Sequence, residues 1–173
     1  MPTLHEDIEY RFFKSRFGAC LIARSEQRIC GLEFVNGSRA ETLQRLERYH
    51  PGATLARGDR QLVGLAESIF EPGLRVRPDL HLSGTDFQIA VWNSLYQIPL
   101  GGTASYQAVA EAIGRPRAVR AVANAVASNR LAYLVPCHRV VRSNGALGGY
   151  RWGVALKSAL LDWETAESHR LLH

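Results

Sequence analysis

The first third of the chain alternates hydrophobic and polar positions. Ile8, Tyr10 and Phe12 stand at every second position, with polar residues between them. Because successive side chains of a strand point to opposite faces, this alternation predicts a strand with one buried face. Residues 29–35 form a second, mostly apolar run, and the polar stretch 24–28 before it suits a hairpin turn. We therefore expect strands joined by tight turns between residues 8 and 35.

Helical spacing follows these strands. Leucines recur at three-residue spacing within residues 39–49, and residues 59–70 form a second helical candidate. Each candidate ends shortly before a Pro-Gly pair, which cannot continue a helix. Residues 74–82 are expected to return as a strand. These elements predict a small α/β domain over residues 1–82, without a glycine-rich phosphate loop.

From residue 83 onward the hydrophobic spacing is that of helices. The expected helices are residues 87–96, 105–113, 116–128 and 154–163, the last of them ending at Glu164. Gly114 ends the second of these helices and Pro116 suits the first turn of the third, so the pair forms a helix-turn-helix. We therefore predict an α+β fold, in which the small α/β domain is followed by a mostly helical domain over residues 83–173.

The second helix of this helix-turn-helix has two contrasting faces. Its expected core face holds apolar residues at spacings of three, four and seven: Val119, Val122, Ala123 and Val126. Its expected outer face holds small and basic residues: Ala118, Ala121, Ala125, Arg117 and Arg120. Small side chains let a helix backbone approach a narrow surface, which suggests contact with a DNA minor groove and one arginine projecting into the duplex. An alanine-rich packing helix is the alternative, and this pattern alone favours neither.

Charge is concentrated in the same half of the chain. The 173 residues carry a formal net charge of +5, yet no acidic residue stands between Glu111 and Asp162, an interval that holds eight basic residues. The other 13 basic residues are accompanied by all 16 acidic ones. Such segregation indicates a polyanionic partner, most often nucleic acid. The alternative is a solvated surface that happens to be basic.

Composition excludes several classes of protein. With 46% hydrophobic and 21% charged residues the chain can bury a core, and it contains no apolar run long enough to span a membrane. The polar, acidic first ten residues argue against a secretory signal. Three cysteines without metal-type spacing, Cys20, Cys30 and Cys137, argue against a disulfide framework. We expect a cytoplasmic protein without metal, in which Cys20 and Cys30 pack in the core.

Cys137 is the candidate nucleophile. It follows Pro136 and precedes His138 and Arg139, with apolar residues on both sides. A thiol reacts as its thiolate, which positive charge or a nearby imidazole favours. A lone cysteine is more often a packing residue. Its position inside the basic segment, between the helix-turn-helix and a glycine-aromatic loop over residues 148–153, favours chemistry here.

These residues resemble a known family. Pro136-Cys137-His138-Arg139-Val140 is similar to the active-site signature of the O6-alkylguanine-DNA alkyltransferases, the methylated-DNA–protein-cysteine methyltransferases. Agreement extends over about residues 84–164, through Gly84-Thr85, Phe87-Gln88, Val91-Trp92, Ser105-Tyr106-Gln107, Ala118-Val119-Arg120-Ala121-Val122 and Gly148-Gly149-Tyr150-Arg151-Trp152-Gly153. The first half resembles more loosely the family's N-terminal, RNase H-like domain. Among family members, the chain most resembles the C-terminal half of the bacterial adaptive-response proteins.

The resemblance implies direct reversal of DNA damage by a monomer without a cofactor. Cys137 would take the alkyl group, typically methyl, from O6-alkylguanine, and also from O4-alkylthymine, in double-stranded DNA. The base would first be flipped out of the stack. Transfer would be stoichiometric and irreversible, so that each protein molecule reacts once.

The resemblance also implies roles for individual residues. His138 would act through a water as the base for Cys137, and Glu164 would orient His138. Asn129 would brace the turn that joins the helix-turn-helix to the cysteine. Tyr106 would help to turn the nucleotide out and donate a proton to the departing guanine.

Further implied contacts involve DNA and the guanine pocket. Arg120 would insert where the base was, and the minor groove would be lined by Ala118, Val119, Ala121 and Ala123. The family therefore turns Val119 and Ala123 outward, whereas the hydrophobic pattern turns them inward. The pocket would be formed by Gly148, Tyr150, Arg151 and the carbonyls of Cys137 and Val140. The Arg151 amide would donate to O6 and Tyr150 would close the pocket.

The chain departs from some relatives. Where certain relatives hold zinc in the N-terminal domain, this chain has Ser25 and Cys30, so we expect no structural zinc. It also lacks the four-cysteine cluster of the adaptive-response proteins' additional domain. Two alternatives are a helix-turn-helix regulator without alkyl transfer and a cysteine hydrolase, the latter supported by nothing beyond the Cys-His pair.

Overall fold

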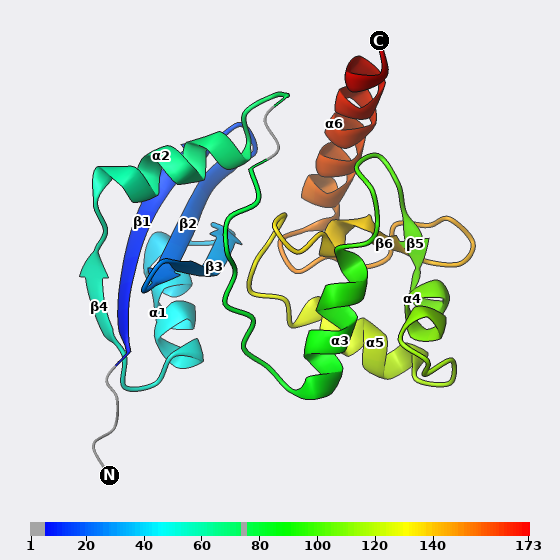
Figure 1. Ribbon diagram of the computed structural model, residues 1–173, viewed down its shortest axis with the longest axis horizontal. Helices are drawn as coiled ribbons and strands as arrows, with labels where there is room; N and C mark the ends of the chain where they lie inside the picture. The colour runs from blue at the N-terminus through cyan, green and yellow to red at the C-terminus, as the bar shows by residue number, and fades with distance from the viewer. Residues whose placement is uncertain (1–5, 74–75) are drawn as a thin grey trace. The chain divides into compact units, whose positions relative to one another are not determined.

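The computed structural model describes residues 6–73 and 76–173. The chain divides into two compact units, Met1–His81 and Leu82–His173. Figure 1 shows the sheet and two helices of the first unit and the helices of the second. The α+β prediction is confirmed by this architecture.

The first unit is built on a four-stranded sheet in the order β3-β2-β1-β4. Its elements are β1 (Asp7–Ser15), β2 (Gly18–Ser25), β3 (Arg28–Phe34), α1 (Arg39–Tyr49), β4 (Thr54–Arg57) and α2 (Arg60–Ile69). The first three strands form an antiparallel meander, and β4 pairs parallel to β1. The strands expected between residues 8 and 35 and both expected helices are confirmed.

The alternation of side chains places one helix on each face of this sheet. Leu46 of α1 packs with Ile8, Leu21 and Cys30 on one face. Phe13 points to the other face, where its ring lies 6.2 Å from that of Phe70, the residue that ends α2. Figure 1 shows α1 and α2 on the two sides of the strands. The expectation that Cys20 and Cys30 are packing residues is confirmed, since both are buried in strands.

The first unit differs from the prediction in two places. Strand β4 was not predicted, because its four residues are mostly exposed and show little hydrophobic pattern. In the expected strand over 74–82, residues 74 and 75 lie outside the described part. The remainder makes a single bridge, between Leu80 and Ile29, instead of a regular strand.

The second unit contains four α-helices and a pair of two-residue strands within the described residues. They are α3 (Asp86–Leu95), β5 (Ala104–Ser105), α4 (Tyr106–Ala112), α5 (Val119–Ala127), β6 (Val140–Val141) and α6 (Val154–Leu172). Ser105 caps α4 through its side chain, as expected, and β5 pairs parallel to β6. This pairing brings the start of the helix-turn-helix beside the segment that follows Cys137.

Helix α5 differs from its prediction in start and in rotation. It begins at Val119 rather than at residue 116, because residues 115–118 close a separate turn in which the Ala118 amide donates to the Arg115 carbonyl. Its buried residues are Val122, Ala125 and Val126. Ala125 is thus inward rather than outward, whereas Val119 and Ala123 are only half-buried.

The rotation of α5 has an identifiable cause in helix α3. The indole Nε1 of Trp92 donates to the carbonyl of Ala125 at 2.9 Å. The hydroxyl of Ser128 donates to the same carbonyl at 2.8 Å. A small side chain at position 125 lets the large Trp92 ring approach closely, so the tryptophan determines which face of α5 turns inward.

Helix α6 is longer than predicted. It continues from Val154 to Leu172 instead of ending near Glu164, since the residues after Glu164 include no glycine or proline that would stop it. Its buried face consists of Lys157, Leu160 and Glu164. The burial of Lys157 was not predicted, and Glu164, expected at the end of the helix, is a buried residue within it. No helix of the described residues combines the length and the hydropathy needed to cross a bilayer.

Candidate active site

One buried amide shapes the segment that leads from helix α5 to the cysteine. The Nδ2 group of Asn129 donates to the carbonyls of Leu131 at 3.2 Å and Val135 at 3.0 Å. Its Oδ1 accepts from the Leu131 amide at 2.9 Å. Because a buried amide so fully engaged tolerates few other backbone paths, Asn129 fixes the turn over residues 129–135. This is the place that the resemblance gave to Asn129.

Cys137 opens a short 3-10 turn, η1 (Cys137–Arg139), and its thiol is buried. Its Sγ accepts from Nδ2 of Asn129 at 3.1 Å. Burial raises the pKa of Cys137, and hydrogen bonds from Asn129 and Tyr150 and the charge of Lys157 oppose that rise without cancelling it. The resting thiol is therefore protonated, so that nucleophilic attack needs a base.

His138 and Glu164 form a pair with no exposed surface. The ring Nε2 of His138 lies 2.8 Å from Oε1 of Glu164. Burial lowers the pKa of His138, although hydrogen bonding to Glu164 acts in the opposite direction. A neutral imidazole that donates from Nε2 carries its lone pair on Nδ1, and Nδ1 is buried without a hydrogen-bond partner among the described residues. The ring is therefore arranged as a base at Nδ1.

Arg139 completes the charge balance of this pair. It donates from Nε to Oε2 of Glu164 at 2.8 Å and from Nη2 to Oε1 at 2.6 Å. Its Nη1 donates to the carbonyl of Ile98 at 2.7 Å. Bidentate pairing of this kind holds the carboxylate ionised and in one orientation. The sequence placed Arg139 in the motif, but its partner, 25 residues away, was not predicted.

Lys157 is a buried cation that sequence reasoning missed. Its side chain has no exposed surface, and its Nζ donates to the carbonyls of Val140 at 2.6 Å, Leu147 at 2.5 Å and Gly149 at 3.2 Å. Burial lowers the pKa of Lys157 to about 8, and attraction to Cys137 opposes that shift. Its spacing of three from Leu160 was the available signal, since it places Lys157 on the buried face of α6.

Tyr106 and Gly148 lie against each other. A Cβ atom added at Gly148 would meet the Tyr106 hydroxyl at 3.4 Å, and the φ of Gly148 is 69°, a conformation that favours glycine. Burial raises the pKa of Tyr106, and the negative charge of an ionised Cys137 adds to the rise. Tyr106 is therefore a protonated donor near the cysteine.

The other predicted pocket residues have contacts of their own. Tyr150 lies close to Cys137, where its side chain opposes the rise in the pKa of the thiol. The guanidinium of Arg151 turns to the carbonyl of Asn129 at 3.1 Å and lies over the Trp152 ring. The carbonyl of Val140, expected to accept from guanine, already accepts from Lys157, although a carbonyl has a second lone pair. The pocket residues are thus tied to both Asn129 and α6.

The helix face expected to meet DNA is partly open. Arg120 and Ala121 are exposed, whereas Ala118, Val119 and Ala123 are half-buried. Neither the expected inward nor the expected outward placement of Val119 and Ala123 is fully met.

The described residues contain no group of three or more histidine, cysteine, aspartate or glutamate side chains that could hold a metal ion. Cys30, at the position where some relatives bind zinc, packs against Ile8 and Leu46 in the sheet core. The serine in question, Ser25, is likewise buried.

Fold and site together define a class of protein: a helix-turn-helix unit that carries a buried cysteine beside a histidine–carboxylate pair. Family models agree with this class. The 6-O-methylguanine DNA methyltransferase DNA binding domain matches residues 86–166, and the ribonuclease-like domain of the same name matches residues 8–65. The chain belongs to the methylated-DNA–protein-cysteine methyltransferase family.

Individual relatives support this assignment. The inducible methylated-DNA–protein-cysteine methyltransferase of Bacillus subtilis is 40% identical, with 82% of this chain and 83% of the relative covered. The bifunctional transcriptional activator and DNA repair enzyme Ada of Escherichia coli is 40% identical over 94% of this chain, but only 47% of Ada is covered. The regulatory protein Ada of Salmonella typhimurium is 43% identical, and 43% of its length is covered. The chain thus spans less than half of these two relatives.

Solved structures agree with the fold. Mycobacterium tuberculosis OGT in complex with DNA is 34% identical, with a TM-score of 0.76 over 92% of this chain and 94% of that chain. The O6-methylguanine methyltransferase of the same organism gives a TM-score of 0.77 at 33% identity, with the same coverage of both chains. The family resemblance predicted from the sequence is therefore confirmed.

Proposed function

We propose that this protein repairs DNA by moving an alkyl group, typically methyl, from O6-alkylguanine to Cys137, once per molecule. The observation that carries the proposal is the arrangement around the buried thiol. Asn129 donates to Sγ at 3.1 Å, and the neighbouring His138 has its Nε2 engaged by Glu164. Its Nδ1 is thereby the basic atom of the ring. Family membership supports the same substrate class. O4-alkylthymine presents a similar bond and is a second proposed substrate.

The proposed transfer conserves protons and electrons. The Cys137 proton passes through a water to Nδ1 of His138, and the thiolate sulfur attacks the alkyl carbon in line with the C–O6 bond. A carbon–sulfur bond forms as the C–O6 bond breaks, and its electron pair leaves with guanine. The departing base needs one proton, which Tyr106 can donate and then recover from the imidazolium. The net products are unmodified guanine and S-alkylcysteine.

The product explains why the reaction would stop after one turn. A thioether carbon has no leaving group that water could displace at a useful rate, unlike the ester of an acyl-enzyme. The alkylated sulfur would also remain inside the fold, where Cys137 is 3% exposed. We therefore propose consumption of the protein with no cofactor and no regeneration step.

Delivery of the base is proposed to involve the helix-turn-helix. Arg120 and Ala121 are exposed on α5, and the acid-free interval around them supports a DNA partner. We propose that α5 enters the minor groove and that Arg120 occupies the space of the flipped base. Ala118, Val119 and Ala123 would line the contact with their exposed portions. The DNA complex of the Mycobacterium tuberculosis relative supports DNA as the partner class.

Compartment and assembly complete the proposal. All three cysteines are free thiols, which supports a reducing, cytoplasmic location. We propose that the protein acts as a monomer, because one chain contains every group that the transfer needs. Any regulatory activity of the longer relatives is left out of the proposal, since the chain covers less than half of their length.

The proposal is tested by stoichiometry on both partners. A duplex carrying methyl-labelled O6-methylguanine should lose one label per protein molecule, and the label should appear on the protein. Cys137→Ser should accept none while still binding the duplex. Many labels lost per protein would indicate a turning-over enzyme, and duplex binding without any transfer would favour a helix-turn-helix regulator.

A further inference from the structure

Tyr133 adopts a backbone conformation that tyrosine rarely takes. Its φ is 65°, and among the described residues only Glu26 shares a positive φ without being glycine. Glu26 lies in the turn between β2 and β3, where such a conformation is common. Tyr133 does not lie in a hairpin turn. A left-handed conformation costs roughly 1–2 kcal/mol for such a residue, and strain of this kind is found at functional sites.

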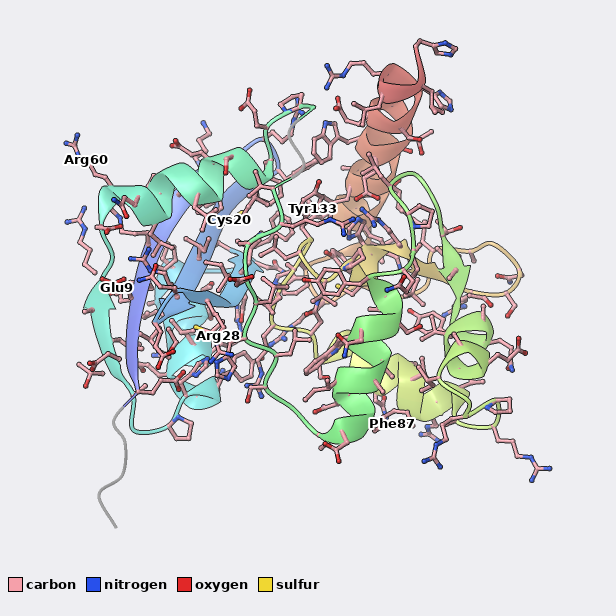
Figure 2. The ribbon with its side chains drawn as sticks, viewed as in Figure 1. Glu9, Cys20, Arg28, Arg60, Phe87 and Tyr133 are labelled. Atoms are coloured by element: carbon pink, nitrogen blue, oxygen red, sulfur yellow. The ribbon has the colours of Figure 1, made fainter. Side chains whose placement is uncertain are left out.

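The strain places the Tyr133 ring on the catalytic histidine. The two rings are stacked, with centroids 5.7 Å apart and an interplanar angle of 10°. The Tyr133 ring also packs with Trp163 of α6, with ring centroids 5.8 Å apart. Figure 2 labels Tyr133, whose ring packs with Trp163 in the middle of α6. His138 has no exposed surface, and this stack covers one face of its ring.

The turn that carries Tyr133 is rigidly held. The Val135 amide donates to the Leu131 carbonyl at 2.9 Å, which closes the turn around Tyr133. Asn129 binds the carbonyls at both ends of the same turn. The Asn129 side chain, which donates to the Cys137 sulfur, thus also fixes the turn that contains Tyr133. A ring held in this way can define the plane of its neighbour.

We propose that Tyr133 is a positioning residue for His138: its ring fixes the imidazole plane and keeps bulk water away from one face of the imidazole. The hydrogen bond to Glu164 fixes one end of the imidazole but leaves rotation about that bond open. The stack removes this freedom and so directs Nδ1. This inference rests on the proposed function, since it concerns the base of the alkyl transfer.

Apart from the phenol of Tyr133 itself, four charged or titratable groups lie near the imidazole. Glu164 and Lys157 come from α6, and Cys137 and Arg139 come from η1. Burial is the main cause of the lowered pKa of His138. Removal of the Tyr133 ring should admit water and raise the pKa of His138 toward its ordinary value, with the four charged groups unchanged. A residue that merely fills space elsewhere would not shift this pKa.

The test uses three substitutions of Tyr133 in the full chain. Tyr133→Phe keeps the stack and should keep the single-turnover rate at saturating O6-methylguanine duplex within about threefold. Tyr133→Ala should lower it about ten- to a hundredfold, the range expected when a base is misplaced. Tyr133→Gly should lower it equally but unfold at the same or higher denaturant concentration than Tyr133→Ala, because glycine accepts the positive φ. Glu26→Gly is the matched control, with relieved strain and an unchanged rate.

The second readout does not depend on alkyl transfer. The pKa of His138, followed by NMR through its ring protons, should rise in Tyr133→Ala and Tyr133→Gly but not in Tyr133→Phe. Unchanged rate and unchanged pKa in the glycine variant would overturn the positioning role. If the unsubstituted protein transfers no alkyl group, the proposed function fails, and the NMR titration still decides whether Tyr133 controls the His138 environment.

Discussion

Glu164 and His138 are ionisable groups without exposed surface, and burial acts on their pKa values in opposite directions. Burial raises the pKa of Glu164, but hydrogen bonds from His138 and Arg139 outweigh it, so the net shift is downward. Burial also lowers the pKa of His138. A carboxylate that stays ionised beside an imidazole that stays neutral is the combination that a general base requires.

Both shifts predict sensitivity to acid. The unfolded chain binds a proton at this histidine below about pH 6.5, whereas the folded chain binds it only at lower pH, so the free energy of unfolding falls as pH decreases through that window. The stabilisation from Glu164 is present above about pH 4.5 and is lost as pH falls through its lower folded pKa. Thermal melting between pH 7 and pH 4 should show a falling melting temperature. Glu164→Gln should change that slope, and an identical slope would contradict the assignment.

At the scale of elements, the structure of the site depends on how α5 and α6 are rotated. The ends of α1 could be predicted because a capping box, Ser38 with Glu41, and a Pro-Gly pair flank it. The rotation of α5 could not, because Val119 and Ala125 both fit an apolar pattern and only contact with Trp92 selects between them. The burial of Lys157 on α6 was not predicted, and only the resemblance placed Glu164 beside His138, since charged residues are rarely buried without partners that sequence alone does not show.

Two alanines of α5 allow stability and DNA contact to be separated. Ala125 is buried under Trp92, so Ala125→Leu should overpack the core and lower the free energy of unfolding by about 1–3 kcal/mol. Ala121 is exposed, so Ala121→Leu should leave stability within about 0.5 kcal/mol. Ala121→Leu should instead weaken duplex binding while leaving reaction with free O6-benzylguanine intact. Urea titration and duplex-binding isotherms measure both effects. Equal losses of stability would show that the assigned rotation is wrong.

Lys157 links helix α6 to strand β6 and the following loop through hydrogen bonds. In Lys157→Met the side-chain volume is kept, but the carbonyls of Val140, Leu147 and Gly149 lose their shared donor. We expect the free energy of unfolding to fall by about 3 kcal/mol, as for buried polar groups left unpaired. Lys14→Met, at an exposed strand position, is the control and should change it by less than about 0.5 kcal/mol. Equal effects of the two substitutions in urea denaturation would contradict the anchoring role.

At the scale of the whole molecule, some features could be predicted from the sequence and others could not. The α+β fold, the family and the cysteine motif followed from spacing and resemblance. The resemblance predicted the His138–Glu164 pair and the bracing role of Asn129. The links through Arg139 and Lys157 were not predicted, because they join residues far apart in the sequence, as Arg139 donates to the Ile98 carbonyl 41 positions away. Short motifs identify the reacting group, whereas tertiary packing sets its protonation.

The central claim is that Cys137 is an acceptor consumed by one transfer. The most direct measurement is the intact mass of the protein after incubation with excess O6-methylguanine duplex, followed by peptide mapping. We predict a gain of one methyl group, about 14 Da, on the peptide that contains Cys137, with no second addition over time. An unchanged mass with repaired DNA, or a methyl group on another residue, would contradict it.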